Sequence, residues 1–386
     1  MSSNADRIPL PQVRDLLQVG HPLPFRVLDA HDRLLLNAGH VLADEDQFEA
    51  LVERGAWAER PLVEAERAAR TAAAEKARKA APPVSLFDRW ERLLWQFDKL
   101  TRALARREAP GSAVLPFLAA LRELVDRDPD VALFLCVRQD DRRFALYALT
   151  HALHSAVLAL LTGRQLAWPD AKIDSLGAAA LTMNLAVLEL QATMAEQDDP
   201  PTPRQLEQIR AHPDASVQLL RAAGITDEAW LATVAHHHEQ TGGGGYPRGL
   251  TEVTDLAQVL RAADVYMAKI SARAKRPAMS TQQATRQLFQ QRPNDPLTMA
   301  MVKTIGVHPP GSLLQLASGE VAVSIRRPAK GTQPIAATLS DRHGKPVGDT
   351  HQRDTAQAEF AVSAPLTDTK AFPRVLPERV YGWIAG

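Results

Sequence analysis

Residues 236–247 read His236-His237-His238-Glu239-Gln240-Thr241-Gly242-Gly243-Gly244-Gly245-Tyr246-Pro247. This stretch places three consecutive histidines, at the expected end of a helix, directly before four glycines and a Tyr-Pro pair. Imidazoles are common metal ligands, and glycines allow the backbone beside them to bend sharply. The stretch therefore predicts a site in which ligand side chains lie next to a tight loop.

The composition is that of an ordinary globular protein. Hydrophobic residues make up 45% and charged residues 23% of the 386 residues, and 45 basic residues balance 45 acidic ones. Because the net charge is zero, no overall electrostatic field attracts a polyanion, and no nucleic-acid partner is predicted. Cys136 lies in an apolar run and is expected to be a buried, inert thiol. Because the chain shows neither a signal peptide nor an apolar run of roughly 20 residues, we expect a cytoplasmic protein without a membrane span.

The chain is predicted to have four parts. Residues 1–62 suggest a small α+β module with a hairpin over 23–36, in which His21, His31 and His40 are surface residues. Residues 63–110 suggest an exposed helical linker followed by an amphipathic helix. Its apolar face, from Phe87 to Leu104, fits either core packing or a homodimer contact, and linker and helix could run continuously. Residues 111–306 read as an all-α domain and 307–386 as a small β module.

Periodicity and capping signals predict the helices of the central domain. Long apolar helices are expected over 142–165 and 173–196. A capping box at Thr202 opens the next helix, which has to accommodate Pro213. Further helices are expected from residue 226 into the three histidines, over 255–272, after Ser280 and after Asp295.

Several of these helices carry residues that could converge on a metal. His151 and His154 share one helix, and the other candidates are His212, His237, His238 and Asp264. Imidazole with carboxylate suits zinc, iron or manganese, and a helical bundle supplies such ligands from facing helices. Each histidine alone also fits a satisfied core residue, so both interpretations stay open here.

The chain resembles the HD-GYP family of bacterial cyclic di-GMP phosphodiesterases over roughly residues 142–279. The matching segments are His154-Ser155, His212-Pro213, His237-His238-Glu239, Gly245-Tyr246-Pro247-Arg248-Gly249-Leu250 and Ala263-Asp264-Val265-Tyr266. The resemblance implies an all-α bundle that holds two or three metal ions, commonly iron or manganese, with a bridging water that attacks a phosphodiester. It assigns His154, His212, His237, His238 and Asp264 as metal ligands and Arg273 and Arg276 as phosphate-binding residues.

The same resemblance exposes a departure at the residues that give the family its name. Where the family has Ala-Ala-Leu-Leu-His-Asp-Ile-Gly-Lys, this chain has Met183, Asn184 and Val187 in place of histidine, aspartate and lysine. Asn184 cannot supply the charge of the bridging carboxylate, and the thioether of Met183 suits hard divalent metals poorly. A paired-metal centre should therefore be severely weakened, although His212, His237 and His238 could still hold one metal.

These observations favour a degenerate HD-GYP-like protein of bacterial cyclic di-GMP signalling. We expect it to be catalytically impaired and to act by binding cyclic di-GMP or a protein such as a diguanylate cyclase. The flexible, exposed loop of Gly242, Gly243, Gly245, Tyr246 and Pro247 is the candidate contact surface. The alternatives are a metal-dependent phosphodiesterase or phosphohydrolase with a reduced metal site, and a scaffold whose histidines are core residues. The cofactor is either one divalent ion (Fe, Mn or Zn) or none.

Overall fold

The computed structural model describes residues 6–80, 84–138, 146–274, 276–366 and 375–385. They belong to two compact units, Met1–Pro83 and Val84–Gly386. Helices predominate, and a small antiparallel sheet lies near each end of the chain. The mainly α class with two small flanking modules is therefore confirmed, whereas the finer boundaries at residues 62, 110 and 306 stay predictions.

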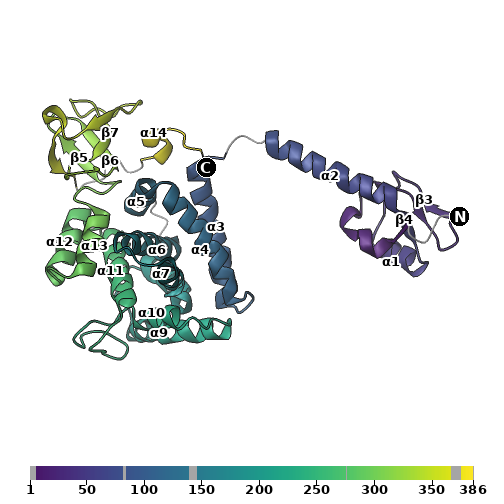
Figure 1. The fold of residues 1–386 in the computed structure, drawn as a ribbon, viewed down its shortest axis with the longest axis horizontal. Helices are drawn as coiled ribbons and strands as arrows, with labels where there is room; N and C mark the ends of the chain where they lie inside the picture. The colour runs from purple at the N-terminus through teal and green to yellow at the C-terminus, as the bar shows by residue number, and fades with distance from the viewer. Residues whose placement is uncertain (1–5, 81–83, 139–145, 275, 367–374, 386) are drawn as a thin grey trace. The chain divides into compact units, whose positions relative to one another are not determined.

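The first unit is a four-stranded sheet with helices packed on it (Figure 1). Its elements are β1 (Arg7–Pro9), η2 (Leu10–Leu16), β2 (Val27–Leu28), β3 (Leu34–Leu36), α1 (Glu45–Glu53), β4 (Trp57–Glu59) and α2 (Arg60–Ala80). The strand order is β1-β4-β2-β3, and β2 pairs antiparallel with β3 as the hairpin prediction required. His21, His31 and His40 are exposed, in agreement with their interpretation as surface residues.

Ser85 starts the second unit's first helix, α3 (Leu86–Ala105), with a capping box. Its hydroxyl accepts the backbone N–H of Asp88 at 3.0 Å, and the Asp88 carboxylate accepts the N–H of Ser85 at 3.0 Å. The backbone of Ser85 is extended, with ψ 160°. The prediction that linker and helix could run continuously is therefore wrong. The apolar face of α3, including Phe87 and Leu104, is buried in the unit's own core, and the homodimer contact stays a prediction.

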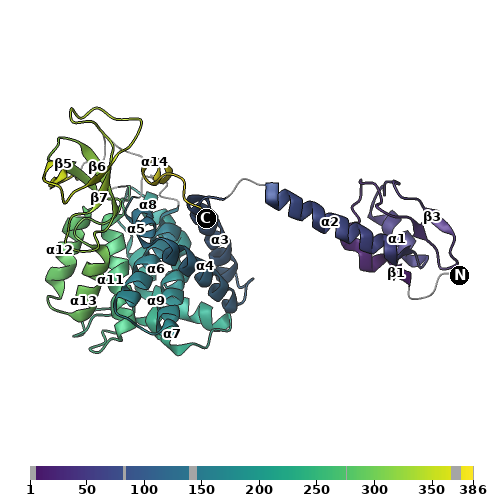
Figure 2. The same ribbon diagram turned by 45° about the horizontal axis from the view of Figure 1, so that its top comes forward.

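The helices that follow pack around one large apolar core (Figure 2). They are η3 (Gly111–Ala113), α4 (Val114–Arg127), α5 (Pro129–Val137), α6 (Tyr147–Gln165), α7 (Asp170–Thr182), η5 (Leu185–Val187), α8 (Leu188–Glu196), α9 (Pro203–Ala222), α10 (Glu228–His236), α11 (Asp255–Ile270), α12 (Thr281–Gln291) and α13 (Pro296–Ile305). The predicted caps at Thr202, Ser280 and Asp295 all accept backbone N–H groups of their helices. Residues 142–145, at the predicted start of α6, lie outside the described residues.

The helix predicted over 173–196 is instead two helices, and this expectation was wrong. α7 ends at Thr182, Met183 and Asn184 follow, and η5 leads into α8. Met183 is fully buried and Asn184 is 2% exposed. An 18-residue window within Asp170–Glu196 has a mean hydropathy of 1.4, which is apolar enough for a membrane-crossing helix, but 72% of that window is buried inside the protein. Burial of this kind is what a core segment of a helical bundle requires.

The C-terminal module is a five-stranded antiparallel sheet at one end of the bundle (Figures 1 and 2). Its elements are β5 (Leu313–Leu316), β6 (Val321–Arg326), β7 (Ile335–Thr338), β8 (Gln352–Asp354), η6 (Ala358–Phe360), β9 (Val362–Pro365) and α14 (Pro377–Tyr381), with strand order β8-β7-β6-β5-β9. Phe134 of α5 shares a buried cluster with this sheet, and its ring meets that of Tyr381 edge-on at 5.2 Å. The sheet therefore packs on the bundle.

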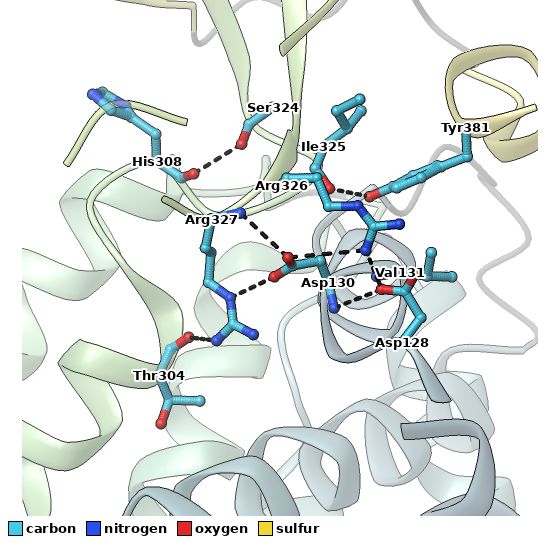
Figure 3. A network of polar contacts seen from close by, with 10 residues as sticks. All are labelled: Asp128, Asp130, Val131, Thr304, His308, Ser324, Ile325, Arg326, Arg327 and Tyr381. Carbon is cyan, nitrogen blue, oxygen red and sulfur yellow. Dashed lines mark hydrogen bonds and ion pairs between the residues drawn. The ribbon is translucent and has the colours of Figure 1, made fainter. Parts of the chain in front are cut away.

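Charged contacts reinforce this packing where β6 ends (Figure 3). Arg327 Nε donates to Asp130 Oδ1 at 2.5 Å, and its guanidinium also donates to the carbonyl of Thr304 at 2.7 Å. Arg326 pairs with Asp128, whose carboxylate also caps α5 by accepting the N–H groups of Asp130 and Val131. The last residue of β6 and the residue that follows it are thus tied to α5 and α13.

Candidate metal centre

His212 lies in the middle of α9, where the next residue is a proline. A proline has no N–H, so Pro213 leaves the carbonyl of Ile209, four residues earlier, without its helical donor. Nδ1 of His212 takes that place and lies 2.5 Å from the Ile209 oxygen. Because a carbonyl only accepts, the proton of the neutral imidazole is on Nδ1. Nε2 therefore carries the lone pair.

The same arrangement recurs at His237, which follows the last residue of α10. The final carbonyls of a helix have no intrahelical partner, and Nδ1 of His237 lies 2.7 Å from the oxygen of Val234. Its Nε2 is then also a lone-pair nitrogen. The Nε2 atoms of His212 and His237 lie 3.1 Å apart. Because each ring carries its proton on Nδ1, neither Nε2 has a hydrogen to donate to the other.

Two facing lone pairs at this distance repel each other unless a cation lies between them. Burial, with the neighbouring His237 as a second cause, lowers the pKa of His212 to about 3, so a shared proton is not favoured near neutral pH. Burial also lowers the pKa of His237 and His238. Ligand atoms of His212, His237 and His238 all lie within 4.8 Å of one another. The donor set thus fits one divalent metal ion, for which neutral imidazoles are suitable ligands.

Asp264, on α11, adjoins this cluster and is held from two sides. Nε2 of His151 lies 2.7 Å from its Oδ1, and Nδ1 of His238 lies 3.8 Å from its Oδ2. Burial alone would raise the pKa of Asp264, but the hydrogen bond from His151 and the favourable electrostatic influence of the nearby histidines hold it below its usual range. The carboxylate is therefore ionised, and His151 orients it.

His154, the predicted first ligand, does not join the three-histidine group within the described residues. It is half-buried, and its Nδ1 has no hydrogen-bond partner in the part of the chain that is described. Burial and the neighbouring His151 lower its pKa to about 3. The assignment of His154 as a ligand thus stays a prediction, while His151, which had been assigned no role, contacts Asp264. The signal for it was its place one turn before His154.

The positions of the missing His-Asp pair are buried in the bundle. Met183 is fully enclosed, and Nδ2 of Asn184 has no hydrogen-bond partner among the described residues. Ala186, two residues on, donates its N–H to Ser216 Oγ at 3.1 Å, one turn after His212 on α9. A thioether and a neutral amide therefore occupy the segment next to the helix that carries His212, and Val187 is likewise buried.

Glu239 fixes the glycine loop, which we define as residues 240–250. Its side chain is fully buried, and its two oxygens accept the N–H groups of Arg248 at 2.6 Å and Leu250 at 3.0 Å. The ring of Tyr246 stacks on His238 with centroids 4.5 Å apart. Gly242 and Pro247 are exposed, and Gly243, Gly245 and Tyr246 are half-buried. The loop is thus closed at its base by a residue that the sequence analysis gave no role.

His236 is not part of the three-histidine group and contacts Arg248 instead. Its Nε2 lies 3.0 Å from the guanidinium of Arg248, which also pairs with Asp214 at 2.6 Å. The two predicted phosphate-binding arginines contact residues outside the three-histidine group. Arg273 contacts the hydroxyl and the ring face of Tyr147, and Arg276 donates to the carbonyl of Ala268. Lys275, between them, lies outside the described residues.

Comparisons with known proteins found a family match and several similar proteins. Residues 138–296 match the family described as HD domain. Over 207 residues the chain is 26% identical to the cyclic di-GMP phosphodiesterase PA4108 of Pseudomonas aeruginosa, which covers 52% of this chain and 50% of that protein. It is 25% identical over 139 residues to the cyclic di-GMP phosphodiesterase PdeB of Borreliella burgdorferi, covering 36% of each. The chain thus spans half or less of the length of these relatives.

A solved structure is also similar. Bd1817, an HDGYP protein from Bdellovibrio bacteriovorus, aligns with a TM-score of 0.45 and 16% identity over 77% of this chain and 97% of that one. The matched HD domain region contains the three clustered histidines, Asp264 and the glycine loop. Residues 138–296 thus match the HD domain family, and the chain is similar to two cyclic di-GMP phosphodiesterases over part of its length.

Proposed function

We propose that this chain is a cyclic di-GMP signalling protein whose HD domain holds one divalent metal and has lost efficient hydrolysis of the dinucleotide. The observation that carries the proposal is the pair of facing Nε2 lone pairs on His212 and His237, with His238 beside them. Three imidazoles and one open position form a familiar site for a single metal. In such a site a bound metal polarises an oxygen ligand.

The loss of hydrolysis is inferred from what surrounds the cluster. A pair of divalent ions requires bridging negative charge, and the segment expected to supply it offers Met183 and Asn184. Asp264 is the carboxylate beside the cluster, and it is already bonded to His151. We therefore infer that the protein acts by binding, with cyclic di-GMP or a partner protein at the face formed by the cluster and the glycine loop.

The named relatives support the ligand class, because both are cyclic di-GMP phosphodiesterases. The glycine loop supports a protein contact, since it is exposed at Gly242 and Pro247 yet held at its base by Glu239. A diguanylate cyclase domain remains the proposed partner class for it. Cyclic di-GMP phosphodiesterase activity with a single metal remains the alternative.

Metal content and cyclic di-GMP turnover of the purified full chain test the proposal together. We expect about one metal per chain, bound cyclic di-GMP and no appreciable hydrolysis. His237→Ala should remove the metal. His236→Ala is the matched control and should keep it, because His236 contacts Arg248 and not the cluster.

Two results would contradict the proposal. Two or more tightly bound metals per chain would show that the paired centre survives, and rapid turnover abolished by His237→Ala would show an enzyme. Replacing Met183 by histidine and Asn184 by aspartate together should raise the stoichiometry towards two. No increase would mean that the remaining residues cannot complete a second site.

A further inference from the structure

A cavity of about 540 Å³ lies between the base of the glycine loop and helices α11, α12 and α13. This volume is within the range of about 300 to 1,000 Å³ that is typical of small-molecule sites. Apolar side chains, Val259 and Leu288, form part of its wall, and Gln240 and Thr241 close it on the loop side. Nothing proposed for the histidine cluster uses this space.

Most of the charges on the wall already have partners. Both carboxylate oxygens of Glu239 accept backbone N–H groups of the loop. Asp295 caps α13 with Oδ2 and pairs through Oδ1 with Arg292 at 3.0 Å. Arg292 also donates to the side chain of Gln258. These groups neutralise one another in place, so they leave little capacity to bind an ion.

Arg261 is different, because its guanidinium makes no hydrogen bond or ion pair to any residue that the structure describes. It is half-buried and lines the cavity from α11. Burial lowers its pKa, and the charge of Asp264 acts in the opposite direction. A guanidinium has five N–H donors in a planar fork, and those of Arg261 have no protein acceptor among the described residues. An oxyanion in the cavity would satisfy them.

Helix geometry separates this cavity from the histidine cluster. Gln258, Arg261, Ala262 and Val265 are spaced three or four residues apart, so they form one face of α11, and all four line the cavity. Asp264, which faces His151 and His238, points about 110° away from the middle of that face. The two faces belong to one helix but open in different directions.

We propose that this cavity is a second binding site, for a small molecule that presents a phosphate or carboxylate group to Arg261. The planar fork of a guanidinium matches both oxyanions through paired N–H donors, whereas the apolar part of the wall suits the remainder of such a molecule. Because Gln240 and Thr241 belong to both the wall and the loop, the occupant contacts the base of the glycine loop directly.

Calorimetric titration of the full chain tests this site with GMP as the phosphate-bearing probe and citrate as the carboxylate-bearing probe. We expect at least one of them to bind with a dissociation constant below about 1 mM, and the tighter one identifies the oxyanion. Arg261→Gln, which keeps the length and polarity but removes the charge and the fork, should weaken that binding at least tenfold. Arg292→Gln is the matched control on the same wall and should have a clearly smaller effect, because Arg292 is already paired.

A second variant keeps the test decisive if Arg261→Gln does not fold. Ala262→Phe leaves every charge in place but fills the cavity, and it should also abolish binding. Binding must persist in His237→Ala, which separates this site from the proposed metal centre. If neither probe binds, if both variants bind as tightly as the unmodified chain, or if His237→Ala removes the binding, the cavity is not the site we propose.

Discussion

Replacing Pro213 by alanine should stabilise the fold and weaken the histidine site at the same time. Proline lies inside α9, where it removes the hydrogen bond to the carbonyl of Ile209. That carbonyl instead accepts Nδ1–H of His212 at 2.5 Å, which turns the Nε2 lone pair towards His237. An alanine N–H would compete for the same carbonyl, so the imidazole would lose the contact that fixes its tautomer.

The two effects have different sizes. Proline in a helix interior is about 3 kcal/mol less favourable than alanine, and losing the imidazole hydrogen bond returns about 1 kcal/mol. Pro213→Ala should therefore raise the free energy of unfolding of the metal-free protein by about 1 to 2 kcal/mol. Loss of a group that orients a ligand typically lowers metal affinity by about 10 to 100-fold. We expect a decrease in that range.

Chemical denaturation in the presence of a chelator measures the first effect without a contribution from bound metal. Competition with a chromophoric chelator measures the second. Pro203→Ala is the matched control, because Pro203 is the first residue of the same helix, where a proline removes no hydrogen bond. It should change neither quantity appreciably. If Pro213→Ala destabilises the chain, or if it leaves metal affinity unchanged, the role assigned to the Ile209 carbonyl is wrong.

Three further predictions concern the loop and the C-terminal sheet. A Cβ on Gly245 would lie 2.4 Å from the Glu239 Cα, so Gly245→Ala should lower the free energy of unfolding by about 1 to 3 kcal/mol, as measured by denaturation. Gly244→Ala is the control, because a Cβ there would meet no atom nearer than 3.8 Å. It should change the free energy of unfolding by less than about 0.5 kcal/mol. Asp128→Ala should lower the free energy of unfolding by about 1 to 2 kcal/mol, because it removes the N-cap of α5. Asp128→Asn can still cap the helix and should lower it clearly less. Equal losses of stability in the two variants would show that the cap is not the main contribution of Asp128. The hydrogen bond from Arg353 lowers the pKa of Glu320, so the ion pair stabilises the fold above the unfolded pKa of about 4.3, and this stabilisation is lost as pH falls through the folded pKa. The difference in unfolding free energy between Glu320→Gln and the unmodified chain should therefore shrink in that acidic range. A difference that stays constant with pH would argue against the ion pair.

Local signals account for the part of the fold that could be predicted. The caps at Thr202, Ser280 and Asp295 depend on residues three positions apart, so they are visible in the sequence without knowledge of packing. The break between α7 and α8 depends on tertiary contacts. The apolar pattern continues through Met183 and Asn184, and only the packed core shows that both are enclosed at a helix end. Periodicity alone predicts one helix there.

The candidate site shows the same limit. Spacing and residue type were enough to select His212, His237, His238 and Asp264 as candidates. Whether His151 or His154 faces Asp264 depends on the rotation of α6 about its axis, which its neighbours in the bundle determine. Both faces of that buried helix are apolar, so its sequence does not reveal the rotation. Arg261 was missed for a related reason, since its cavity exists only where three helices meet the loop.

The electrostatics of the site explain why one metal, and not two, is the expected content. Two divalent cations about 4 Å apart repel by about 16 kcal/mol at an effective dielectric constant of about 20. A bridging carboxylate about 2.1 Å from each cation attracts each of them by a similar amount, so one such group is enough to offset the repulsion. Asn184 replaces that charge by a neutral amide, and the carboxylate of Asp264 is already shared with His151 and His238. A single ion meets no such repulsion, and three neutral imidazoles remain to hold it. The same substitution that disfavours the second ion therefore leaves the first site intact, which is the difference that the metal-content measurement detects.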